Sequence, residues 1–157
     1  MKMVSLIALT LAASGAFAAP SKKMSCASIK GQKPVISYQI SEDSSRDWEI
    51  VATMKINGFR GEVSDQVSSN DAGGEIDISL SDQTITASAF LTSDDETDMS
   101  AELASVPGSI KLSAGSDEKS GSAKFQGKLT GSVSKGSKVK SAKNSKVNCS
   151  VSWKISG

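Results

Sequence analysis

The sequence contains no histidine, and this absence removes much of the acid–base and metal chemistry that proteins use. A Ser-His-Asp triad cannot form without an imidazole. Zinc sites rely on histidine or on more cysteines than the two present here. No G-x-S-x-G motif occurs, and the S-x-x-K spacings lie in predicted strands or turns without partner motifs. We therefore expect no catalytic residues, no metal, no cofactor and no enzymatic activity. A hydrolase using two carboxylates is the least favoured alternative.

Long apolar runs and aromatic side chains are also scarce. No apolar stretch reaches the roughly 20 residues that a membrane-spanning helix needs, so we expect no transmembrane segment. The lysine-rich C-terminal third holds only two aromatics, Phe125 and Trp153, and both fall at predicted buried positions. Nucleic-acid recognition draws on arginines and exposed stacking aromatics. We therefore expect no nucleic-acid partner.

The first nineteen residues have the three parts of a secretory signal peptide. Lys2 supplies a positive start, residues 4–11 are apolar, and residues 16–18 form an A-x-A cleavage pattern. We predict that residues 1–19 are cleaved and that residues 20–157 form a single all-β domain. The predicted location is periplasmic or secreted, and the style of the signal favours a bacterial source.

The two cysteines stand near the two ends of the predicted mature chain, at Cys26 and Cys149. An isolated pair in an oxidising compartment usually forms a disulfide. Each cysteine is in phase with the inward-facing residues of its predicted strand. We therefore expect a Cys26–Cys149 disulfide that joins the first and last strands. In the chain-entropy model a loop of this length stabilises the folded state by about 5 kcal/mol.

Most of the chain alternates apolar and polar residues with a period of two, which is typical of strands with one buried face. The predicted strands are residues 24–29, 35–40, 48–57, 75–80, 84–91, 99–106, 109–114, 123–133 and 146–155. Asn57-Gly58 and Pro107-Gly108 predict tight turns. We therefore predict an antiparallel β-sandwich or β-barrel of about eight to ten strands.

Charge is strongly segregated along the chain. All seventeen acidic residues lie between Glu42 and Glu118, whereas nine lysines and no acid follow from Lys119 onward. The candidate interaction residues are Ser120, Lys124, Lys128, Lys135, Lys138 and Lys140. We expect Lys124 and Lys128 on one outward strand face and the later lysines in a loop. Such a patch would suit an anionic surface or an acidic protein. Alternatively, lysine strands pair with acidic strands and the surface charge is mixed.

The densest acidic run suggests a weak calcium site as an alternative to a solvated loop tip. Asp94, Glu96 and Asp98 have the spacing of the first ligands of a calcium loop. Met99 and Ser105 stand where an EF-hand needs glycine and glutamate, so this motif is not an EF-hand.

Residues 120–125 (SGSAKF) and 130–136 (TGSVSKG) resemble the two inhibitory loops of the small periplasmic inhibitors of C-type lysozyme. Those inhibitors are disulfide-bearing antiparallel barrels. The resemblance implies that Ser120 and Lys135 would enter a lysozyme cleft. Our leading interpretation is an exported, non-enzymatic binding domain of unidentified ligand. The alternative is an inhibitor of a cell-wall enzyme that acts through residues 119–140.

Overall fold

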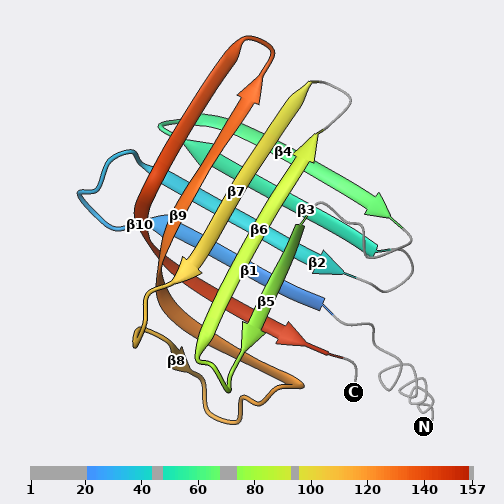
Figure 1. Ribbon diagram of the computed structural model, residues 1–157, viewed down its shortest axis with the longest axis vertical. Coiled ribbons are helices and arrows are strands. Elements are labelled where there is room, and N and C mark those ends of the chain that lie inside the picture. The colour runs from blue at the N-terminus through green and yellow to red at the C-terminus, as the bar shows by residue number, and fades with distance from the viewer. Residues whose placement is uncertain (1–20, 44–47, 68–73, 93–95, 156–157) are drawn as a thin grey trace, which may run out of the picture.

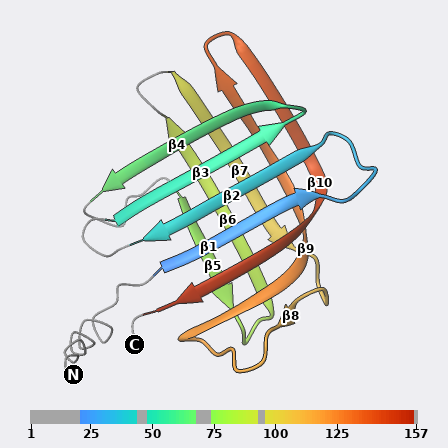
Figure 2. The same ribbon diagram turned by 180° about the vertical axis from the view of Figure 1, so that it is seen from behind.

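A computed structural model describes residues 21–43, 48–67, 74–92 and 96–155 of the chain (Figures 1 and 2). The predicted signal peptide and Asp94 lie outside these residues. The strands are β1 (Ser21–Ser28), β2 (Ile36–Asp43), β3 (Trp48–Ile56), β4 (Phe59–Val67), β5 (Gly74–Ser79), β6 (Thr84–Thr92), β7 (Thr97–Ser105), β8 (Lys111–Leu112), β9 (Ser120–Lys135) and β10 (Lys138–Lys154). The described residues contain no helix.

All strand pairs are antiparallel and belong to one sheet of order β4-β3-β2-β1-β10-β9-β7-β6-β5, with β8 added beside β9. The all-β, antiparallel fold class predicted from the sequence is therefore confirmed. The sheet bends so that β1–β4 cross over β5–β7, and the long strands β9 and β10 run through the bend (Figures 1 and 2). Among the described strands, the edge strands β4 and β5 are not paired with each other.

The space between the two halves of the sheet is filled by alternate residues of each strand. In β3, Ile50, Ala52, Met54 and Ile56 are fully buried, while Lys55 is exposed. In β9 the predicted inward residues from Ala123 to Val133 are all buried as well. The predicted inward phase of these strands is thus confirmed. In the last predicted strand, residues 146–155, the alternation places Ile155 inward. Ile155 instead lies beyond the end of β10 and is 38% exposed.

Two stretches of strand were missed by the sequence pattern, and both have a physical reason. β4 places Gly61 at an inward position, where a Cβ atom would collide with Val133 of β9, so the alternation of apolar side chains is broken there. The first half of β10 is rich in lysine and contains a bulge between Ala142 and Ser145, which shifts its phase. The strand expected at residues 109–114 shortens to β8.

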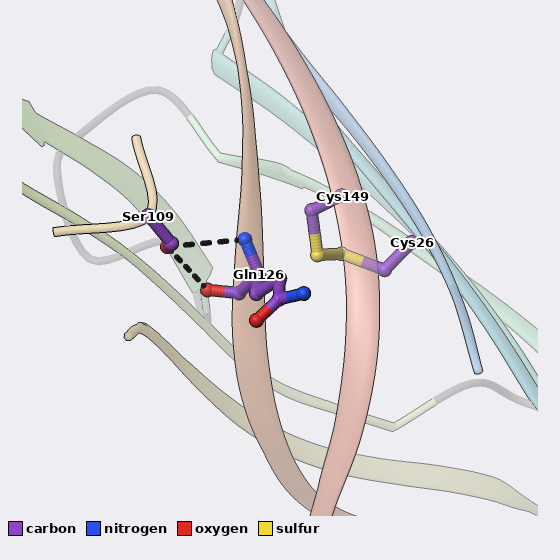
Figure 3. Close-up of a disulfide and its surroundings, with 4 residues drawn as sticks. All are labelled: Cys26, Ser109, Gln126 and Cys149. Atoms are coloured by element: carbon purple, nitrogen blue, oxygen red, sulfur yellow. Dashed lines mark hydrogen bonds between the residues drawn. A yellow bond between two sulfur atoms is a disulfide. The ribbon is translucent and has the colours of Figure 1, made fainter. Parts of the chain in front are cut away.

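The turn predictions agree with the backbone. Asn57 and Gly58, which join β3 to β4, have φ values of 50° and 87°, as a two-residue hairpin turn with both central residues at positive φ requires. Gly108 has a φ of 80°, and Ser109 N–H donates to the Val106 carbonyl at 3.1 Å. The latter segment is held against β9 by the Ser109 hydroxyl, which donates to the Gln126 carbonyl at 3.1 Å (Figure 3).

The predicted disulfide is present. Cys26 of β1 and Cys149 of β10 are cross-strand partners with a Cα–Cα distance of 4.1 Å and an S–S distance of 2.07 Å (Figure 3). Both residues are buried. The bond therefore links the first and last strands in chain order, which are neighbours in the sheet, inside the core.

The edge of β5 is closed by two charged side chains instead of a further strand. Glu42 of β2, only 7% exposed, accepts a hydrogen bond from the Ile76 N–H at 3.1 Å. Lys22 of β1 donates to the Ile76 carbonyl at 2.8 Å. Glu42 and Lys22 are cross-strand partners. Together they hold β5 against the opposite half of the sheet and satisfy backbone groups that an edge strand would otherwise expose.

We predict that replacing both cysteines, as Cys26→Ala with Cys149→Ala, lowers the free energy of unfolding by about 2–5 kcal/mol. The bond closes a loop with a sequence separation of 123 residues, so its loss restores conformational entropy to the unfolded chain. Urea denaturation of the variant and of the oxidised wild type measures the difference. Two reactive thiols in denatured, unreduced wild type would contradict the assignment of the bond.

We predict that Ile50→Asp unfolds the protein, because it places a charge without a partner at a fully buried position. The matched control is Lys55→Asp on the same strand. Lys55 is exposed and lies opposite Arg60, so the new carboxylate faces solvent and an opposite charge. Circular dichroism during thermal melting distinguishes the two variants. Similar losses at both positions would show that the inward phase of β3 is wrong.

We predict that Glu42→Leu destabilises the protein by about 1–3 kcal/mol, because the Ile76 N–H then loses its acceptor in a buried setting. Glu42→Gln keeps a side-chain oxygen that can accept this bond, and it should cost less. Both values are measured by urea denaturation. A Leu variant as stable as wild type would mean that the edge of β5 does not depend on this contact.

Candidate functional site

The lysines of β9 face other lysines across the sheet. The pairing register places Lys128 opposite Lys146 of β10 and Lys124 opposite Lys111 of β8. All four side chains are exposed on the outer face of the sheet. We call Lys111, Lys124, Lys128 and Lys146 the outer lysine cluster.

Within this cluster the register sets lysine opposite lysine, although β7, the strand beside β9, carries acidic residues as the mixed-charge alternative expects. Like charges directly opposite each other in an antiparallel pair are destabilising. The acidic residues of β7 do lie beside β9, but Glu102 is opposite Thr130 and Asp98 is opposite Ser134. Within the described ranges, no carboxylate forms an ion pair with any lysine of the cluster; the salt bridge observed there joins Arg60 and Glu62 of β4 at 3.4 Å.

Three hollows on the surface adjoin the cluster. One of about 460 Å³ is lined by Lys128, Thr130 and Asn144 on one side and by Glu75 and Glu102 on the other. Lys124 lines both of the other hollows. A hollow of about 620 Å³ continues from it over the serines of β1, β9 and β10, and one of about 730 Å³ also contains Lys111. Hydroxyl, amide and carboxylate groups therefore surround the ammonium groups.

The bulge in β10 shapes the hollow next to Lys128. Asn144 has a φ of 48°, which asparagine tolerates better than most residues. Its backbone N–H donates to Thr130 Oγ1 at 2.9 Å. This contact fixes the bulged segment to β9, so that Lys146 returns to a position opposite Lys128 after the shift in register.

The structure separates Ser120 from Lys135, the two residues that the lysozyme-inhibitor resemblance assigns to one cleft. They are the first and last residues of β9. At about 3.3 Å per residue, the strand path between them is about 50 Å long. One partner cleft would have to span the length of β9 to contact both side chains.

Ser120 directly follows a loop that is ordered around Asp117. The backbone N–H groups of Ser120 and Lys119 donate to Asp117 Oδ1 at 3.0 and 2.8 Å, and these hydrogen bonds lower the pKa of the Asp117 carboxyl. The Trp153 indole N–H donates to the Asp117 carbonyl at 2.8 Å. This contact ties the loop to Trp153, which occupies a buried, inward position of β10.

The lysines expected in a loop instead belong to strands: Lys135 ends β9, and the later ones lie in β10. The connection between the two strands is only Gly136 and Ser137, and Lys138, Lys140 and Lys143 follow in strand conformation. The prediction of a long basic loop is therefore wrong. Lys135 and Lys138 are cross-strand partners at the turn, so the same like-charge arrangement recurs there.

Sequence reasoning did not select Lys111 and Lys146 as candidates. Lys146 is recognisable as an outward residue of its strand, but its partner is set by the register between β9 and β10. Lys111 lies in a two-residue strand whose neighbour is likewise set by tertiary pairing. Neither pairing leaves a local signal in the sequence.

The surface around the outer lysine cluster carries ammonium, hydroxyl, amide and carboxylate groups. Ammonium, hydroxyl and amide groups can hold an anion through charge-assisted hydrogen bonds. The described residues contain no group of three or more His, Cys, Asp or Glu side chains that could hold a metal ion. Tyr38 is fully buried, and burial raises the pKa of its hydroxyl above its usual range, so this hydroxyl stays protonated and out of contact with solvent.

No family model, curated protein or solved structure matches this chain. Across the described segments, no helix has the length and apolar character needed to cross a bilayer. Fold alone does not define function, so the chemistry of the surface is the functional evidence that this protein offers.

Proposed function

We propose that this protein is an exported, non-enzymatic binding protein that holds an anionic partner on the outer lysine cluster. The observation that carries the proposal is the direct pairing of Lys128 with Lys146, without a carboxylate bound to either in the described part of the chain. Such a pair raises the free energy of the isolated protein. A bound anion between the two ammonium groups would remove that repulsion.

The spacing of the lysine pairs favours a partner with several negative charges. Cross-strand neighbours have Cβ atoms about 5 Å apart, so both ammonium groups of one pair can reach a single carboxylate, sulfate or phosphate. Lys124 precedes Lys128 by four residues, which is about 13 Å along the strand. A polyanion or an acidic protein surface can therefore contact both pairs at once.

Export is supported by two independent features. The Cys26–Cys149 bond is of the kind that forms in oxidising compartments, and residues 1–19 have the pattern of a signal peptide. The proposed location is the periplasm or the extracellular space of a bacterium. The absence of histidine and the burial of Tyr38 favour a role in binding rather than catalysis.

The test is the double variant Lys128→Gln with Lys146→Gln, assayed against fluorescent dextran sulfate and polyglutamate. We expect affinity at low salt to fall about tenfold, equivalent to about 1.4 kcal/mol, and wild-type binding to weaken as salt screens the charges. The same variant should be more stable than wild type by a few tenths of a kcal/mol, because the like-charge pair is gone.

The matched control is Lys30→Gln with Lys33→Gln, which removes two exposed charges from the β1–β2 connection. This control should retain wild-type affinity and stability. Equal weakening by both double variants would mean that binding follows net charge only and would refute a site on the outer lysine cluster.

A further inference from the structure

The first half of β10 is an open edge of the sheet. Residues 147–154 of β10 pair with β1 on one side and β9 on the other. Residues 138–145 pair only with β9, and no other described strand lies beside them. In Figures 1 and 2 this part of β10 forms the outer margin of the sheet, next to the turn that joins it to β9.

The register identifies which backbone groups face the open side. Lys135 and Lys138 flank the two-residue turn as a hydrogen-bonded pair. Hydrogen-bonded and non-hydrogen-bonded pairs alternate along an antiparallel ladder. Val139 and Ser141 therefore direct their backbone N–H and C=O groups away from β9. Five regular residues, 138–142, precede the bulge, and the Val139 side chain is 61% exposed.

At another edge, formed by β5, side chains cover backbone groups of the edge strand. There, Glu42 and Lys22 occupy the N–H and C=O groups of Ile76, which prevents a further strand from pairing at that residue. In the described structure no side chain is bonded in this way to Val139 or Ser141. The edge of β10 is flanked instead by exposed Lys138, Lys140 and Lys143.

We infer that residues 138–142 of β10 accept an extended acidic segment of a partner protein as an added antiparallel strand. Backbone hydrogen bonds to Val139 and Ser141 would provide the pairing, and the flanking lysines would select acidic side chains. Lysines on an edge oppose pairing with a second copy of the same edge, whereas an acidic strand meets no such repulsion.

This inference rests on the proposed function for the sign of the partner's charge and narrows that partner to a polypeptide. It uses residues outside the outer lysine cluster, so the two proposals can fail separately. The probe is a fluorescent peptide with alternating glutamate and valine. Its control is the same peptide with N-methyl groups on alternate backbone nitrogens, which keeps the charge and removes the donors needed for strand pairing.

Two changes in the protein separate backbone pairing from charge. Ser141→Pro removes the outward N–H and keeps every lysine, and proline is tolerated on an edge strand whose N–H faces solvent. Ser141→Ala is its matched control, because it removes the hydroxyl and keeps the N–H. Lys138→Gln with Lys140→Gln removes charge and keeps the backbone. Thermal melting checks that each variant is folded.

We expect the parent peptide to bind wild type and Ser141→Ala equally. N-methylation of the peptide, Ser141→Pro and the Lys138/Lys140 double variant should each weaken binding at least tenfold. The amide protons of Val139 and Ser141 should gain protection from hydrogen exchange when the parent peptide is bound. If Ser141→Pro does not fold, the N-methylated peptide and the exchange measurement on wild type still decide the question.

Three results would overturn the inference. The first is equal binding of the N-methylated and parent peptides, which would indicate a general polyanion site and leave the proposed function standing. The second is loss of peptide binding in the Lys128/Lys146 variant but not in the Lys138/Lys140 variant, which would place the peptide on the outer lysine cluster. The third is no peptide binding to wild type.

Discussion

The pairing of β9 with β10 is the interaction on which the rest of the structure depends. These two strands have 16 and 17 residues, and their hydrogen bonds continue through the bend that joins the two halves of the sheet. β9 carries β7 on its other side, and β10 carries β1. A slip of one residue in this register would reverse the faces of every side chain in one strand. The same register therefore fixes the inward core, the position of Cys149 and the outward pairing of Lys128 with Lys146.

The sequence was informative where the determining property is local. Alternation with a period of two is set residue by residue, so the inward phase of β3 and β9 could be predicted without knowing their neighbours. The phase of Cys26 and Cys149, together with the signal peptide pattern, likewise predicted their bond. A strand could not be predicted where close packing interrupts the alternation of apolar and polar residues. β4 contains Gly61 because Val133 approaches from the facing half, and no rule of alternation anticipates a contact between distant strands.

The candidate site was predictable only in outline. Segregation of lysine after residue 119 indicated a basic region, but the first half of β10 is an edge, and an edge needs little apolar alternation. Its lysine-rich sequence without alternation therefore predicts a loop. The pairing of lysine with lysine could not be seen at all, since it depends on tertiary register. From the sequence alone, the lysines of β9 could equally lie opposite acidic residues. The register shows instead that Thr130 and Ser134 lie opposite the acidic residues of β7.

The arrangement has energetic costs that the isolated domain must offset. Each like-charge pair destabilises the sheet by up to about 1 kcal/mol. The Tyr38 hydroxyl is buried without a hydrogen-bond partner among the described residues, which costs about 1–3 kcal/mol. Closure of the loop between Cys26 and Cys149 contributes about 5 kcal/mol in the entropic model, comparable to these terms combined. The covalent link between the first and last strands can therefore offset the cost of the like-charge pairs in the outer lysine cluster. A marginally stable domain can carry such like-charge pairs only when a compensating constraint exists elsewhere in the fold.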